Sequence, residues 1–146
     1  MKHTILLVED SKLQKLACEK ILHSAGYLVL YAPDGEESLR LAQESVPDLI
    51  LLDLLLPGIG GEEVLYALKR NPRTERIPVI VLSSLPATKS VELKQAGAAD
   101  YFEKVRLTDH AGGEAAFLAT IDRVLGAKSD RRKESGKQVR AAAGRQ

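Results

Sequence analysis

Short apolar runs alternate with longer amphipathic stretches along most of the chain. Five runs predict strands, because each is short, rich in Leu, Ile and Val, and bounded by polar or turn-forming residues. The predicted strands are residues 5–8, 28–31, 49–52, 77–82 and 99–102. Strands that are apolar at nearly every position are typical of a parallel sheet buried on both faces.

The amphipathic stretches predict five helices. Ser11 can cap the first and Asp34 the second, where Glu37 follows three residues on, as in a capping box. The apolar positions of the first helix that recur at helical spacing are Leu13, Leu16, Ala17 and Ile21. The second helix is expected to stop at Pro47, and the others lie within residues 62–70, 91–96 and 115–125.

Strict alternation of strand and helix predicts an α/β fold, a doubly wound five-stranded parallel sheet with helices on both faces. An eight-stranded (βα)₈ barrel would need far more than 146 residues. The hydrophobic content of 45% supports a core, built mainly from aliphatic residues because aromatics make up only 4%.

Composition limits the choice of cellular compartment and of domain organisation. The single cysteine, Cys18, rules out an intramolecular disulfide, and we expect no membrane insertion and a cytoplasmic location. Residues 127–146 hold seven of the 21 Lys and Arg residues but only two of the 20 acids, with almost no apolar bulk. We therefore expect one domain over 1–126 and a basic, disordered tail or linker over 127–146, which is also the one segment that could contact nucleic acid.

Polar side chains gather where the predicted strands end. Glu9 and Asp10 follow the first strand, Asp53 the third, Ser83 the fourth and Lys104 the fifth. Because the carboxyl ends of parallel strands share one edge of the sheet, and ligands of such sheets bind there, these side chains are expected to lie together.

This set of residues suits phosphoryl chemistry. Three adjacent carboxylates repel one another unless a cation intervenes, and a hard divalent cation such as Mg²⁺ prefers oxygen ligands. A carboxylate can act as the nucleophile. Lys104 and a Ser hydroxyl can stabilise the oxygens of a transferred phosphoryl group.

Four stretches in register resemble the receiver domain of response regulators, the phosphoacceptor module of two-component signalling. They are LLVEDS (6–11), PDLILLDLLLPGIGGEE (47–63), IPVIVLSS (77–84) and GAADYFEK (97–104). The resemblance implies a flavodoxin-like sheet of strand order 2-1-3-4-5. It also implies a signalling role rather than that of an enzyme, with phosphoryl groups arriving from a sensor histidine kinase or the phosphotransfer protein of a phosphorelay.

The resemblance also assigns roles at the site. Asp53 corresponds to the phosphorylated aspartate and Asp10 to a direct Mg²⁺ ligand, while Glu9 would act mainly through water. The backbone carbonyl of Leu55 would complete the protein's share of the metal ligands.

Three further residues correspond to the transfer and switch machinery. Ser83 matches the hydroxyl that moves toward the phosphoryl group, and Lys104 matches the lysine that pairs with it. Tyr101 matches the aromatic switch residue, although an ordinary strand aromatic explains it nearly as well. Leu55 and Leu85 would flank the path of a hydrolytic water, where two leucines predict slow loss of the phosphoryl group.

Two other functions compete with that of a phosphorylated receiver domain. A pseudo-receiver, an interaction module that is not phosphorylated, is the alternative, and the presence of the site residues argues against it. A haloacid-dehalogenase-type phosphatase expects a second Asp where this chain has Leu55. The chain also departs from the receiver pattern at Val105, where most members have a cis proline; we expect a trans bond here because a non-proline cis bond costs roughly 3 kcal/mol.

Overall fold

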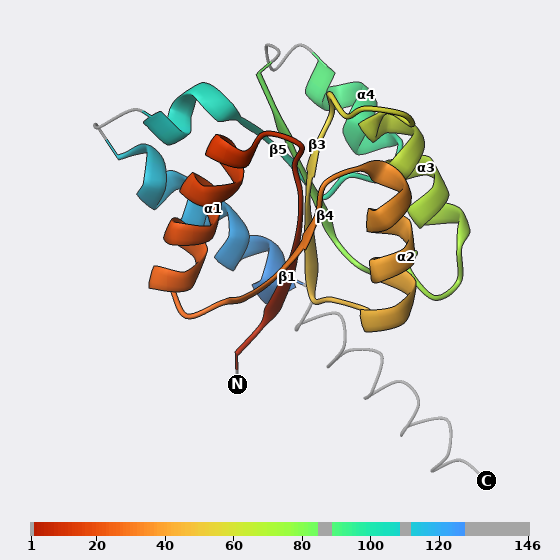
Figure 1. The fold of residues 1–146 in the computed structure, drawn as a ribbon, viewed down its shortest axis with the longest axis horizontal. Helices are drawn as coiled ribbons and strands as arrows, with labels where there is room; N and C mark the ends of the chain where they lie inside the picture. Colours follow the sequence, from red (N-terminus) through yellow and green to blue (C-terminus); the bar gives the residue numbers. More distant parts are fainter. Residues whose placement is uncertain (1, 85–88, 109–111, 128–146) are drawn as a thin grey trace, which may run out of the picture.

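A five-stranded parallel sheet forms the centre of the computed structural model, which describes residues 2–84, 89–108 and 112–127 (Figure 1). The strand order is β2-β1-β3-β4-β5. The strands are β1 (Thr4–Val8), β2 (Leu28–Ala32), β3 (Leu49–Asp53), β4 (Val79–Ser83) and β5 (Asp100–Glu103). The predicted fold class and strand order are therefore confirmed, with strand ends that shift by one or two residues.

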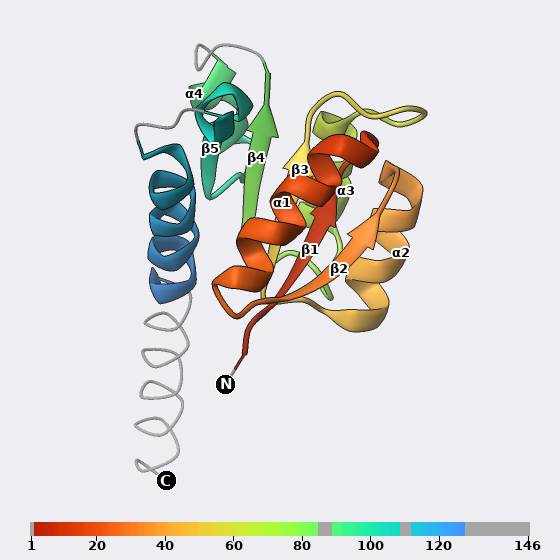
Figure 2. The same cartoon turned by 60° about the vertical axis from the view of Figure 1, so that its left-hand side comes forward.

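Helices cover both faces of the sheet. They are α1 (Lys12–Ser24), α2 (Gly35–Ser45), α3 (Gly61–Arg70), α4 (Ser90–Gln95), the short 3₁₀ helix η2 (Lys104–Thr108) and a last helix described over residues 113–127. The helix 113–127 lies on the same face as α1, and α2 and α3 cover the opposite face (Figures 1 and 2). This arrangement buries both faces of the central strands, so all five residues of β3 and of β4 are buried.

Two apolar clusters fill the space between the sheet and its helices. One lies under α2, α3 and α4 and includes Val64, Leu65 and Leu93. The other lies under α1 and the helix 113–127, where the rings of Phe102 and Phe117 have centroids 5.2 Å apart. The sheet is thus held between two cores, and its strand ends are fixed in space.

The predicted caps of the first two helices are present. The Ser11 hydroxyl accepts a hydrogen bond from the Gln14 N–H at 3.4 Å, and the Asp34 carboxylate accepts one from the Glu37 N–H at 2.8 Å. Helix α2 ends where expected, since Val46, directly before Pro47, adopts a left-handed conformation with φ 43°.

Only part of the apolar spacing expected in α1 faces the sheet. Ile21 is buried as a core position would be, whereas Leu13 is 80% exposed and Leu16 is 61% exposed. Cys18 and Leu22 are buried beside Ile21. Two apolar stripes run along this helix, and helical spacing alone does not decide which one faces the sheet.

The segment after β5 follows the expectation for Val105. The peptide bonds of the described residues are all trans, and η2 begins at Lys104 itself. Among the described helices, none is long and apolar enough to cross a membrane. Apart from Ala127, the predicted tail over 127–146 lies outside the described residues.

Candidate functional site

Three carboxylates meet at the carboxyl edge of the sheet. Glu9 and Asp10 follow β1, and Asp53 ends the neighbouring strand β3, so the two segments lie side by side. One oxygen of each carboxylate lies within 4.8 Å of the others. Glu9 and Asp53 are buried, whereas Asp10 is exposed, which leaves the cluster open to solvent on one side. A set of carboxylate oxygens at this spacing fits a hard divalent cation such as Mg²⁺.

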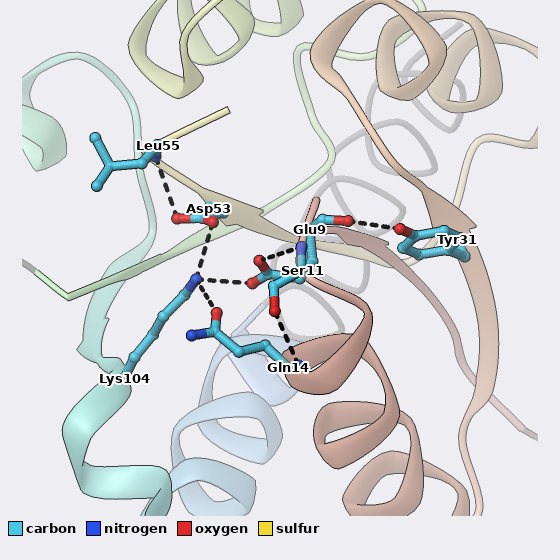
Figure 3. A network of polar contacts seen from close by, with 7 residues as sticks. All are labelled: Glu9, Ser11, Gln14, Tyr31, Asp53, Leu55 and Lys104. Atoms are coloured by element: carbon cyan, nitrogen blue, oxygen red, sulfur yellow. Dashed lines mark hydrogen bonds and ion pairs between the residues drawn. The ribbon is translucent and has the colours of Figure 1, made fainter. Parts of the chain in front are cut away.

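Lys104 reaches into this cluster from the end of β5 (Figure 3). Its Nζ lies 2.8 Å from Oδ2 of Asp53 and 2.7 Å from Oε2 of Glu9. The Lys104 side chain is only 12% exposed, so both ion pairs are largely shielded from water. One ammonium group therefore contacts two of the three carboxylates and offsets one of their negative charges.

Gln14, which the sequence did not single out as a site residue, accepts the third hydrogen bond of this ammonium. Lys104 Nζ donates to Oε1 of Gln14 on the first turn of α1, at 2.5 Å (Figure 3). Gln14 is exposed and lies one turn before the buried Cys18. The contact joins residues that are 90 positions apart, so helical periodicity carries no signal for it.

Burial and charge shift two pKa values at the site. Burial raises the pKa of Glu9, and the nearby Asp53 charge adds to this effect, against the opposing influence of Lys104. Burial alone would lower the pKa of Lys104, but its hydrogen bonds and ion pairs with Asp53 and Glu9 outweigh burial, so that this pKa is raised. The ammonium thus stays charged between the two carboxylates.

Backbone N–H groups orient the carboxylates. The Leu55 N–H donates to Oδ1 of Asp53 at 3.2 Å, and the Ser11 N–H donates to Oε1 of Glu9 at 3.2 Å. The side chain of Leu55 is 58% exposed and points away from Asp53 in Figure 3, so it does not cover the carboxylate. Leu85, expected to flank the same approach, lies outside the described residues.

The start of α3 packs directly behind Asp53. The Gly61 N–H donates to the Leu54 carbonyl at 3.0 Å, and a Cβ at Gly61 would lie 2.4 Å from the Asp53 carbonyl oxygen. Only glycine permits this approach, so the loop after β3 returns tightly against the strand end.

The two residues expected to switch lie on adjacent strands. Ser83 is fully buried at the end of β4, the neighbour of β3, and Asp53 is in register with Leu82. Tyr101 on β5 is half-buried, lies in register with Val81 and packs against the core under α4. Whether either side chain moves on phosphorylation stays a prediction.

A tyrosine at the end of β2 also contacts the site. The hydroxyl of Tyr31 donates to the backbone carbonyl of Glu9 at 2.7 Å (Figure 3). From the sequence, this strand end carries no charged residue comparable to those of the site. The sequence also does not indicate which group the hydroxyl of Tyr31 would contact.

The chain matches the family model described as response regulator receiver domain over residues 5–110. The protein PilH of Pseudomonas aeruginosa is 33% identical over 122 residues, which are 83% of this chain and 96% of PilH. The transcriptional regulatory protein AfsQ1 of Streptomyces coelicolor is 39% identical over 102 residues, 69% of this chain. This chain spans only 44% of AfsQ1.

A solved structure shows the same fold. The receiver domain of the P. aeruginosa sensor histidine kinase PA1611, determined with a magnesium ion in its active-site cleft, superposes with a TM-score of 0.74. The match covers 86% of this chain and 99% of that domain, at 29% identity. The sheet order, the acidic cluster and these matches together show that the chain belongs to the family of response regulator receiver domains, which are signalling modules.

Proposed function

We propose that this chain accepts a phosphoryl group on Asp53 from a histidine kinase or a phosphotransfer protein, in a reaction that depends on Mg²⁺. The observation that carries the proposal is the position of Lys104, whose ammonium joins Asp53 to Glu9 inside an acidic cluster. Lysine side chains at a protein surface are mostly exposed, whereas that of Lys104 is 12% exposed and lies between two buried carboxylates.

The transfer is a displacement at phosphorus. An oxygen of the Asp53 carboxylate supplies an electron pair and forms a new P–O bond, while the P–N bond of a donor phosphohistidine breaks and its electron pair stays on the imidazole. Lys104 offers positive charge to the phosphoryl oxygens, and the Leu55 N–H keeps the carboxylate oriented during the attack. The product is the phosphorylated chain itself, which is why we propose a signalling role rather than that of a turnover enzyme.

The acidic cluster supplies the ligands for Mg²⁺ in this proposal. Asp10, the exposed member, and Asp53 would bind it directly with the Leu55 carbonyl, while Glu9, already paired with Lys104, would act mainly through water. When bound, Mg²⁺ neutralises the carboxylates and the charge on the phosphoryl oxygens. The magnesium ion in the receiver of PA1611 supports this assignment.

A change of interaction surface would follow from the neighbouring strands. Ser83 would donate its hydroxyl to a phosphoryl oxygen, and Tyr101, two strands from Asp53, would take up the space that Ser83 leaves. The proximity of β3, β4 and β5 and the partial burial of Tyr101 support this step. The altered surface would then lie around β5, α4 and η2.

We also propose the domain boundaries and the cellular location of the chain. Residues 1–126 would form the receiver domain, which functions in the cytoplasm without membrane insertion. Residues 127–146 would serve as a basic tail or linker. We do not propose nucleic acid as a partner; if the chain did bind it, the contact would be through this tail.

Beryllofluoride, a stable mimic of a phosphoryl group, tests the switch without hydrolysis. With Mg²⁺ present, we expect amide NMR shifts at Asp53, Ser83 and Tyr101, and no shifts when EDTA removes the metal. The variant Lys104→Met should bind the mimic more weakly, because it lacks the cation that pairs with the phosphoryl oxygens. Shifts that are equal with and without Mg²⁺ would contradict the proposal.

A further inference from the structure

The hydrogen-bond ladder between β1 and β2 ends beside the acidic cluster. Its last backbone bond runs from the Glu9 N–H to the Ala32 carbonyl, at 3.1 Å. Bonds in a parallel ladder alternate between the two strands, so the next one would join the Glu9 carbonyl to the N–H of Asp34. The chain turns away at Pro33 instead, and Asp34 caps α2. The ladder therefore stops one bond short, at the peptide that leads into Asp10.

The hydroxyl of Tyr31 occupies the place of that missing bond. It donates to the Glu9 carbonyl at 2.7 Å (Figure 3). The tyrosine ring is itself held, since Lys15 Nζ on α1 lies 4.3 Å from the ring centroid. The backbone of Glu9 is thus fixed on both sides, through its N–H by Ala32 and through its carbonyl by Tyr31.

We infer that Tyr31 is a positioning residue for divalent-cation binding, acting through the Glu9–Asp10 peptide. This inference rests on the proposed function, because it assumes that the acidic cluster binds Mg²⁺. The orientation of that peptide sets the directions in which the carboxylates of Glu9 and Asp10 leave the backbone. Loss of the hydroxyl leaves the peptide free to rotate, so the carboxylates spread over more positions and fewer of them match the geometry that the cation requires.

A second tyrosine provides a matched control. The hydroxyl of Tyr27 also donates a hydrogen bond, to the carboxylate of Asp122 on the helix 113–127. Tyr27→Phe removes a tyrosine hydroxyl bond away from the cluster, while Tyr31→Phe removes one at the cluster. Both variants keep the aromatic ring, so both are expected to fold.

The experiment is a titration of MgCl₂ into metal-free protein, followed by amide NMR of wild type, Tyr31→Phe and Tyr27→Phe. We expect Tyr31→Phe to raise the Kd for Mg²⁺ by about 3- to 10-fold, in line with the loss of one hydrogen bond that orients the ligands. Tyr27→Phe should keep the wild-type Kd even though it loses stability. The Asp10 amide, which shares its peptide bond with the Glu9 carbonyl, should shift in Tyr31→Phe before any metal is added.

The outcomes separate this inference from the proposed function. A Kd in Tyr31→Phe equal to that of wild type overturns the positioning role. The same holds if Tyr27→Phe weakens Mg²⁺ binding as much, since the effect would then follow stability alone. If metal-free wild type does not bind Mg²⁺, the proposed function fails and this inference falls with it.

Discussion

Nζ of Lys104 lies 2.8 Å from Oδ2 of Asp53, although 51 positions separate the two residues in the chain. The same ammonium also contacts Glu9 and Gln14, so its three hydrogens are all directed to acceptors. Two carboxylates that would otherwise repel one another are held together by one largely shielded cation. The stability of the metal-free protein should therefore depend on Lys104.

Lys104→Met should lower the free energy of unfolding of the metal-free protein by about 2 kcal/mol or more, because it leaves buried carboxylates without their cation. Mg²⁺ should restore part of this loss, since it neutralises the same groups. Urea unfolding with EDTA and with MgCl₂ measures both effects. Lys89→Met is the control, because Lys89 forms an exposed pair with Glu62 at 3.8 Å and its loss should change stability by less than about 0.5 kcal/mol. Equal effects of the two variants would contradict the role of Lys104.

Gly61→Ala should destabilise the protein by about 2 kcal/mol, because the new Cβ meets the Asp53 carbonyl oxygen and the Leu54 Cα, neither of which can yield without moving the strand end. Gly126→Ala serves as the control, since a Cβ there meets nothing within 4 Å and alanine favours the helix. Thermal unfolding should thus show opposite signs for the two changes. A neutral Gly61→Ala would mean that α3 does not pack this closely behind Asp53.

Val46→Gly should stabilise the fold by about 1 kcal/mol. Val46 is a β-branched residue at φ 43°, a left-handed conformation that glycine adopts without strain. Val91→Gly provides the comparison, because Val91 is exposed in the helix α4 and its replacement should cost about 0.5 kcal/mol of helix propensity. If denaturant unfolding shows Val46→Gly to be as destabilising as Val91→Gly, the left-handed end of α2 is wrong.

Cys18 should make the protein less stable at alkaline pH. Burial, with a contribution from the Glu9 charge, raises the pKa of this thiol to about 11, above its ordinary value of 9.0. The folded state therefore keeps a proton that the unfolded state releases, so this contribution to stability is complete below pH 9 and is lost as the pH rises toward 11. Between pH 8 and pH 10, wild type should lose about 1 kcal/mol more than Cys18→Ala in urea unfolding. Parallel losses in the two proteins would show that the thiol is not buried as described.

Much of the fold follows from the sequence because its strands are buried on both faces. Runs such as residues 49–52 leave no polar position for solvent, and alternation with helices leaves few topologies. The convergence of Glu9, Asp10, Asp53 and Lys104 was predictable for the same reason, since parallel strands end at one edge. The order of the strands came from the resemblance to receiver domains and not from the pattern.

The rotation of α1 about its own axis could not be predicted in the same way, and neither could the partners of long polar side chains. The exposed Leu13 and the buried Cys18 both fit a helical period, and packing against the sheet selected between their stripes. The contacts of Gln14 with Lys104 and of Tyr31 with Glu9 join residues that are 90 and 22 positions apart. Such contacts depend on tertiary structure, which periodicity does not contain.

Intact mass spectrometry after incubation with a small phosphodonor and Mg²⁺ tests the central claim most directly. Asp53→Asn removes the proposed nucleophile. Asp48→Asn is its matched control, because Asp48 directly precedes the opposite end of the same strand and accepts a hydrogen bond from the Thr4 N–H. We predict that wild type and Asp48→Asn each gain the mass of one phosphoryl group, and that Asp53→Asn, and wild type in EDTA, gain none. Uptake by Asp53→Asn equal to that of wild type, or no uptake by wild type with Mg²⁺ present, would contradict the assignment of Asp53 as the phosphoacceptor.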